Sequence, residues 1–72
     1  MVNINKLKGK IVENGTSIEK IAEIMGVDRS TLYRKLGQNG EKITIRDADL
    51  IAKVLGLKID EVNSIFFSQY VA

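Results

Sequence analysis

The 72-residue chain contains no cysteine and no histidine. Their absence excludes disulfide bonds, a thiolate nucleophile, an imidazole general base and the usual zinc or iron–sulfur ligand sets. A domain of this size also rarely forms a cleft deep enough to shift a pKa or to exclude water from a reaction. The sequence therefore disfavours an enzyme, and we expect no metal, no cofactor and no small-molecule substrate.

Long apolar runs are missing as well. No stretch approaches the roughly 20 apolar residues of a membrane span, and the first ten residues, MVNINKLKGK, lack the apolar core of a signal peptide. We therefore expect no membrane association and a cytoplasmic location. The hydrophobic share of 44% and the charged share of 28% are typical of a folded globular protein. A single domain over residues 1–72 is expected, because a second core would need roughly 50 residues of its own.

Positive charge is concentrated in the middle of the chain. The formal net charge is +2, but residues 29–46 carry five basic side chains and one acidic side chain, a net charge of +4. The residues before this segment sum to zero and those after it to −2. A basic segment is the electrostatic footprint expected of phosphate contact, although solvated surfaces of soluble proteins also carry such segments. Charge alone leaves both interpretations open.

The spacing of apolar residues predicts an all-α domain of five short helices. No segment of useful length alternates polar and apolar residues with the period of a strand. Because the chain has no proline, the helix ends are inferred from capping residues and glycines. The predicted helices cover about residues 4–13, 17–25, 29–36, 45–55 and 59–67. Residues 68–72 form a tail that is either a further turn or an extended arm.

Capping residues mark the predicted helix starts. Asn3 precedes the first helix, and Thr16 begins a T-x-x-E capping box that ends on Glu19. Thr44 caps the fourth helix, with Asp47 at the third helical position. These side chains satisfy backbone N–H groups that have no partner within the helix.

Glycines mark the predicted helix ends. Gly15, Gly26 and Gly56 each follow an apolar stripe and are expected to adopt a left-handed conformation. The segment 37–42 contains two glycines and no periodicity, and we expect it to be a surface loop. Asp28 is expected to cap the third helix, in preference to reading a cytosine.

The second and third predicted helices have the features of a helix-turn-helix, which needs two short helices joined by a tight turn. Ala22 must be small because the two helices of the motif cross close together at this position. Gly26 permits a positive φ where the chain reverses. The angle between the two helices is expected to be filled by Ile21, Val27 and Leu32.

The segment TSIEKIAEIMGVDRSTLYRKL resembles the helix-turn-helix of the Cro and lambda-repressor-like family, also called the XRE family. The later segment TIRDADLIAKVLGLKIDEV is similar to the fourth and fifth helices of that family, with the signature A-x-x-L-G from Ala52 to Gly56. The likeness covers about residues 4–67, and the small size and FF-containing ending also resemble Cro-like and repression-modulating proteins of temperate phages. It implies a five-helix lambda-repressor-like DNA-binding domain that works in a bacterial host cell.

The resemblance implies that the third predicted helix lies in the major groove of DNA. The residues expected to contact base edges are Arg29, Ser30, Tyr33 and Arg34. For Tyr33, packing across the helix surface onto the following loop is an equal alternative. The residues expected to contact phosphates are Thr16, Ser17, Lys35 and Lys42. The family usually has an apolar residue where this chain has Lys35, and we expect Leu36 to take that core position.

Aromatic side chains are few and lie near the C-terminus. Three of the four fall within the last seven residues. We expect Val62, Ile65 and Phe66 to close the core beneath the first helix. The remaining apolar side chains of the ending cannot easily fit the same core, and would form a patch suited to a protein partner. This expected protein–protein interface comprises Phe67, Tyr70 and Val71.

Two functions remain open. The first is a Cro-like transcriptional regulator of phage type that binds double-stranded DNA as a homodimer, on half-sites about one helical turn apart. The second is an antirepressor or modulator of repression, which forms a hetero-complex with the DNA-binding domain of a repressor. The modest net charge requires a dimer or a partner for tight DNA binding. Acidic Asp28 and the aromatic ending favour the second function.

Overall fold

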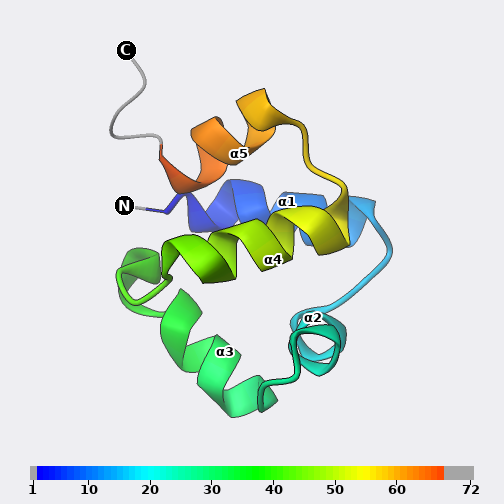
Figure 1. The fold of residues 1–72 in the computed structure, drawn as a ribbon, viewed down its shortest axis with the longest axis vertical. Helices are drawn as coiled ribbons and strands as arrows, with labels where there is room; N and C mark the ends of the chain where they lie inside the picture. The colour runs from blue at the N-terminus through cyan, green and yellow to red at the C-terminus, as the bar shows by residue number, and fades with distance from the viewer. Residues whose placement is uncertain (1, 68–72) are drawn as a thin grey trace.

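The structure is a computed structural model that describes residues 2–67 (Figure 1). Residues 2–67 contain no strand, which confirms the all-α, five-helix prediction. A short 3-10 turn, η1 (Gln38–Gly40), follows the third helix. The five α-helices are α1 (Ile4–Glu13), α2 (Ile18–Met25), α3 (Arg29–Leu36), α4 (Ile45–Leu55) and α5 (Ile59–Phe66).

The core is assembled from all five helices. The five largest fully buried side chains come from five different helices. Each helix is too short to be stable alone and depends on burying its apolar stripe against the others. The five side chains are Leu7, Ile21, Leu32, Ile51 and Ile65. Among the expected core residues near the C-terminus, Phe66 is also buried, whereas Val62 is half-buried and packs against the cluster.

The start of the chain is held against its later half. The Asn3 N–H donates to the Ile65 carbonyl at 2.7 Å, and the Val2 N–H donates to the Asn39 carbonyl at 3.2 Å. An ion pair between Lys10 of α1 and Glu61 of α5 adds a polar contact at the edge of the same pair of helices. These contacts fix α1 beside α5, while α4 lies between α5 and α3 (Figure 1).

The helix ends follow the predicted signals in most places. Asn3 caps α1 by accepting from the Lys6 N–H at 3.1 Å. Thr44 and Asp47 form the expected reciprocal capping box at the start of α4. Gly15, Gly26 and Gly56 all have φ between +63° and +75°, so the left-handed stops are confirmed.

One predicted cap is wrong, and another is confirmed in its position only. Ser17, not Thr16, caps α2, and its hydroxyl accepts from the Lys20 N–H at 3.2 Å. The helix therefore starts at Ile18, and Glu19 stands too early in it to complete the predicted box. Asp28 occupies the N-cap position of α3, but its side chain makes no capping hydrogen bond.

The segment after α3 is more than the surface loop that the sequence predicts. Gly40 is buried at the end of η1, with a φ of +72°. A Cβ built at this position would lie 2.7 Å from the Cβ of Val2. The glycine therefore permits both the left-handed backbone and the close approach of the N-terminal segment.

Replacing Gly40 by alanine should lower the free energy of unfolding by about 2 kcal/mol, because of the left-handed backbone and the clash with Val2. Denaturant unfolding followed by circular dichroism measures the change. Gly9→Ala is the matched control, since that glycine lies inside α1 and a Cβ there meets nothing within 4 Å. The control should gain up to about 1 kcal/mol. Equal effects of the two substitutions would contradict this account.

None of the helices within residues 2–67 has the length and apolar content needed to cross a membrane.

Candidate nucleic-acid interface

A tight turn sets the angle between α2 and α3. Gly26 has φ +75° and ψ +26° and ends α2. The Val27 N–H then donates back to the Ala22 carbonyl at 3.0 Å, which closes the turn. The Ala22 side chain is almost fully buried, as expected for a residue at the crossing of two helices. The turn therefore holds α3 across α2 in a helix-turn-helix arrangement.

The outer face of α3 is exposed to solvent. Leu32 and Leu36 point into the core, with Leu36 taking the apolar position as expected. The opposite face and one residue of α2 line a shallow surface hollow. The hollow is lined by Glu19, Arg29, Ser30, Tyr33 and Arg34. All four side chains expected to contact base edges are thus brought together on one exposed surface, which we call the α3 face.

Tyr33 connects the two helices of the motif. Its hydroxyl donates to the Oε2 atom of Glu19 in α2. This hydrogen bond raises the pKa of Tyr33 and lowers the pKa of Glu19, because it favours the neutral phenol and the ionised carboxylate. The Tyr33 hydroxyl therefore contacts α2, and packing of its ring onto the loop stays a prediction. The partner is α2, and the tyrosine ring stays partly exposed on the α3 face.

Ser30 makes a second hydrogen bond at the edge of the α3 face. Its hydroxyl donates to the Oδ2 atom of Asp28 at 2.7 Å. This bond lowers the pKa of Asp28, since it stabilises the ionised carboxylate. With its proton engaged, the Ser30 oxygen offers lone pairs and can accept a hydrogen bond from a base.

The residues expected to hold phosphates lie in two different settings. Ser17 and Lys42 are exposed, at the start of α2 and after η1. Thr16 is half-buried in the turn between α1 and α2, where its N–H donates to the Ile11 carbonyl at 3.2 Å. The backbone N–H of Thr16 is therefore already used within the protein.

Lys35 has a different partner from the expected phosphate. Its Nζ lies 2.8 Å from the Oδ2 atom of Asp47 in α4, and the Asp47 side chain is nearly buried. This ammonium neutralises a carboxylate and ties α3 to α4. Lys35 therefore has a structural role in the described protein, and its expected phosphate contact stays a prediction.

The expected protein–protein interface is described only at Phe67. This side chain is half-buried and packs against the core at the end of α5. Tyr70 and Val71 lie outside the described residues.

The sequence predicts Glu19 as part of a helix cap and gives no sign of its place on the α3 face. Glu19 and Tyr33 are 14 residues apart, so no helical periodicity connects them. The two residues come together only when α2 and α3 cross at the angle of the helix-turn-helix. Among residues 2–67, no group of three or more acidic side chains gathers closely enough to hold a metal ion.

Comparison with known families supports this geometry. Residues 6–39, which span α1 to η1, match the family described as the helix-turn-helix domain of resolvase. No curated protein and no solved structure matches the chain. The match covers α2, the turn and α3, and it supports the motif without selecting the Cro family in particular. The chain thus contains a helix-turn-helix, formed by α2, the turn and α3 and similar to the one that this family describes.

Proposed function

We propose that this protein is a Cro-like transcriptional regulator of phage type, which reads a DNA sequence with α3 and works as a homodimer. The observation that carries the proposal is the α3 face. It presents two arginines and a serine from one exposed helix, held against the core by a helix-turn-helix. Helices presented in this way enter the major groove and contact base edges with their first turns.

The side chains on the α3 face suit different base edges. The guanidinium of Arg29 or Arg34 can donate two hydrogen bonds to guanine O6 and N7. Ser30 can accept from an adenine or cytosine amino group through its free lone pairs. The exposed ring edge of Tyr33 can contact a thymine methyl group while its hydroxyl stays on Glu19. Direct readout in this proposal rests mainly on the two arginines.

Phosphate contacts would set the register of the protein on the duplex. The start of α2 offers backbone N–H groups and the Ser17 hydroxyl, and Lys42 adds a cation after η1. Thr16 adds a hydroxyl beside the same helix start. One domain with so few cationic contacts would bind weakly and with a steep salt dependence. Two copies on half-sites about one helical turn apart would multiply the affinity.

Arg34→Ala should weaken binding to the preferred duplex by about 1–3 kcal/mol and leave binding to a scrambled duplex unchanged. Lys42→Ala should weaken binding to both duplexes by a similar factor, because a phosphate contact carries no sequence information. A preferred duplex selected from a random pool and a scrambled duplex of the same composition, both titrated by fluorescence anisotropy, measure these effects.

Equal losses on both duplexes from both substitutions would contradict α3 as the reading helix. Each titration is repeated at two salt concentrations. For Lys42→Ala the slope of log affinity against log salt should fall by about 1, because one cationic contact is lost.

A second candidate is the antirepressor, which binds the DNA-binding domain of a repressor. One observation favours it: the carboxylates of Glu19 and Asp28 lie beside the arginines at the α3 face. Carboxylates repel phosphates but can pair with basic side chains of another DNA-binding protein. Titration of DNA with and without a purified candidate repressor separates the candidates. Altered repressor occupancy without any DNA binding by the protein alone would support the second.

A further inference from the structure

Glu19 is an acidic side chain on the α3 face, although it belongs to α2. It is exposed and lines the same hollow as the α3 residues that are proposed to read bases. A carboxylate on a surface that binds DNA lowers affinity, because it repels phosphates. The position of Glu19 beside two arginines therefore indicates a role other than phosphate contact.

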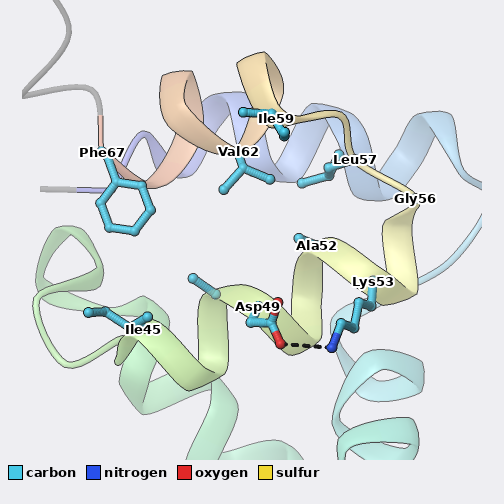
Figure 2. Close-up of a pocket in the computed structure, with 10 residues that line it drawn as sticks. Ile45, Asp49, Ala52, Lys53, Gly56, Leu57, Ile59, Val62 and Phe67 are labelled. Carbon is cyan, nitrogen blue, oxygen red and sulfur yellow. Dashed lines mark ion pairs between the residues drawn. The ribbon is translucent and has the colours of Figure 1, made fainter.

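Two other exposed carboxylates lie outside the α3 face and have cationic partners of their own. Glu23 lies one turn further along α2, with 3.9 Å between its carboxylate and the Lys20 ammonium. Asp49 lines an apolar groove between α4 and α5, with 3.0 Å between its carboxylate and the Lys53 ammonium (Figure 2). Neither carboxylate lines the hollow of the α3 face. Glu19 therefore differs from both in its neighbours.

The Tyr33 hydroxyl holds the Glu19 carboxylate in place by donating to its Oε2 atom. This hydrogen bond lowers the pKa of Glu19, and the positive charge of Arg29 acts in the same direction. The carboxylate is therefore ionised at neutral pH. An ionised carboxylate can accept at about four lone-pair sites. One hydrogen bond from Tyr33 thus leaves Glu19 able to accept from a second donor.

The arginines of the α3 face provide donors beside this acceptor. Within residues 2–67, neither Arg29 nor Arg34 takes part in an ion pair. In the major groove, guanine offers the acceptors O6 and N7, and the cytosine paired with it offers the N4 amino group as a donor. An arginine and a glutamate on one surface are therefore complementary to a single G·C base pair.

We propose that Glu19 is a specificity-determining residue, which accepts a hydrogen bond from the amino group of a cytosine while an arginine of α3 binds the paired guanine. Tyr33 is the positioning residue for the Glu19 carboxylate. Where a duplex offers only phosphates to the hollow, the same carboxylate is repelled, so it also lowers non-specific binding. This inference rests on the proposed function, because it requires α3 to lie in the major groove.

Glu19→Gln should reduce the preference for G·C over A·T at one position of the preferred duplex by about 10-fold, because the carboxylate that selects the cytosine amino group is lost. It should also strengthen binding to a scrambled duplex by about 5-fold, because one negative charge near the phosphates is removed. The glutamine keeps an oxygen to which the Tyr33 hydroxyl can donate. Anisotropy titrations of the preferred duplex, its single base-pair variants and the scrambled duplex measure both effects.

Glu23→Gln is the matched control on α2, and Asp49→Asn is a second control on α4. Each removes one exposed negative charge outside the α3 face. The base preference should stay unchanged, and affinity for the scrambled duplex should change by less than about 2-fold, since salt screens the more distant charges. Equal effects of Glu19→Gln and Glu23→Gln would overturn the proposal.

The role of Tyr33 can be measured without DNA. The hydrogen bond to Glu19 raises the pKa of Tyr33, and NMR titration of the tyrosine ring carbons follows Tyr33 separately from Tyr70. Glu19→Gln should return this pKa toward the ordinary value of tyrosine, because the negative charge that opposes ionisation is lost. An ordinary pKa of Tyr33 in the wild type would overturn its positioning role.

Tyr33→Phe separates position from charge, because it removes the hydrogen bond and keeps the Glu19 carboxylate. This variant should lose part of the G·C preference without binding the scrambled duplex more tightly. An unchanged G·C preference in Tyr33→Phe would overturn the positioning role.

The outcomes distinguish this inference from the proposed function. A wild type that binds all duplexes equally overturns both, because α3 then reads no sequence. A clear G·C preference that persists in Glu19→Gln overturns this inference alone. If the wild type binds no duplex and Glu19→Gln weakens binding to a purified candidate repressor, the carboxylate belongs to the second candidate function, and this inference is also overturned.

Discussion

Replacing Leu32 by alanine should lower the free energy of unfolding by about 2–5 kcal/mol. Leu32 is 1% exposed and is the α3 member of the central core cluster. Truncation removes buried apolar surface, which lowers the stability of the fold. It also leaves a cavity that the neighbouring helices cannot readily fill. A domain of this length has a total stability of about 4–11 kcal/mol. The variant therefore loses a large share of its stability, and α3 loses its attachment to the core.

Denaturant unfolding followed by circular dichroism measures this loss. Val12→Ala is the control, because Val12 is an exposed aliphatic residue and its truncation should change stability by no more than about 0.5 kcal/mol. A loss below about 1 kcal/mol for Leu32→Ala would be incompatible with a tightly packed contact between α3 and the other helices.

Replacing Asp47 by alanine should cost about 2–4 kcal/mol. Asp47 is 7% exposed and is the one buried charged residue among residues 2–67. Its Oδ2 atom accepts from Lys35 at 2.8 Å and from the Thr44 N–H at 3.1 Å. The substitution leaves the ammonium without its partner and the start of α4 without half of its capping box. The single substitution therefore weakens both the contact between α3 and α4 and the cap of α4.

Asp49→Ala is the matched control for Asp47→Ala. Asp49 pairs with Lys53 four residues later on the same helix, but both side chains are largely exposed. Removal of such a pair should cost about 0.3–0.5 kcal/mol. Both variants are measured by denaturant unfolding at neutral pH and at a concentration where each is monomeric. Equal losses would show that burial adds nothing to the Asp47 contact.

The effect of Asp47 should also depend on pH. Burial raises the pKa of Asp47, but the hydrogen bonds from Lys35 and Thr44 outweigh it, and the net pKa is lowered. A lowered pKa in the folded protein means that the carboxylate stabilises the fold above the ordinary pKa of aspartate. This stabilisation is lost as the pH falls through the lowered value. The difference in stability between wild type and Asp47→Asn should therefore shrink in acid.

Local signals made most of the helices predictable. Asn3, Thr44, Gly26 and Gly56 each act on backbone groups within one turn, so their positions in the sequence are enough to predict the helix ends. The apolar stripes likewise predicted which faces are buried. The main error at this level was Ser17, which stands beside Thr16 and can cap a helix equally well. A choice between two adjacent capping residues depends on how the preceding turn is packed.

The candidate site was only partly predictable, because its details depend on contacts between helices. Periodicity showed that Arg29 and Arg34 face outward from α3. It could not show that Tyr33 bonds to Glu19, since that contact depends on the crossing angle of α2 and α3. The pairing of Lys35 with a residue of α4 was missed for the same reason. A count of charges along a sequence does not distinguish a basic side chain that is exposed to solvent from one that is paired with a carboxylate.

The hydrogen bond between the Asn3 N–H and the Ile65 carbonyl has a consequence for folding during synthesis. The helix-turn-helix ends at Leu36, but the start of α1 is held by Ile65 of α5, which lies almost 30 residues further along the chain. During translation, α2 and α3 therefore leave the ribosome before the surface that stabilises α1 exists. Because small domains fold as units, the nascent chain should acquire a stable α3 only after α5 has been synthesised.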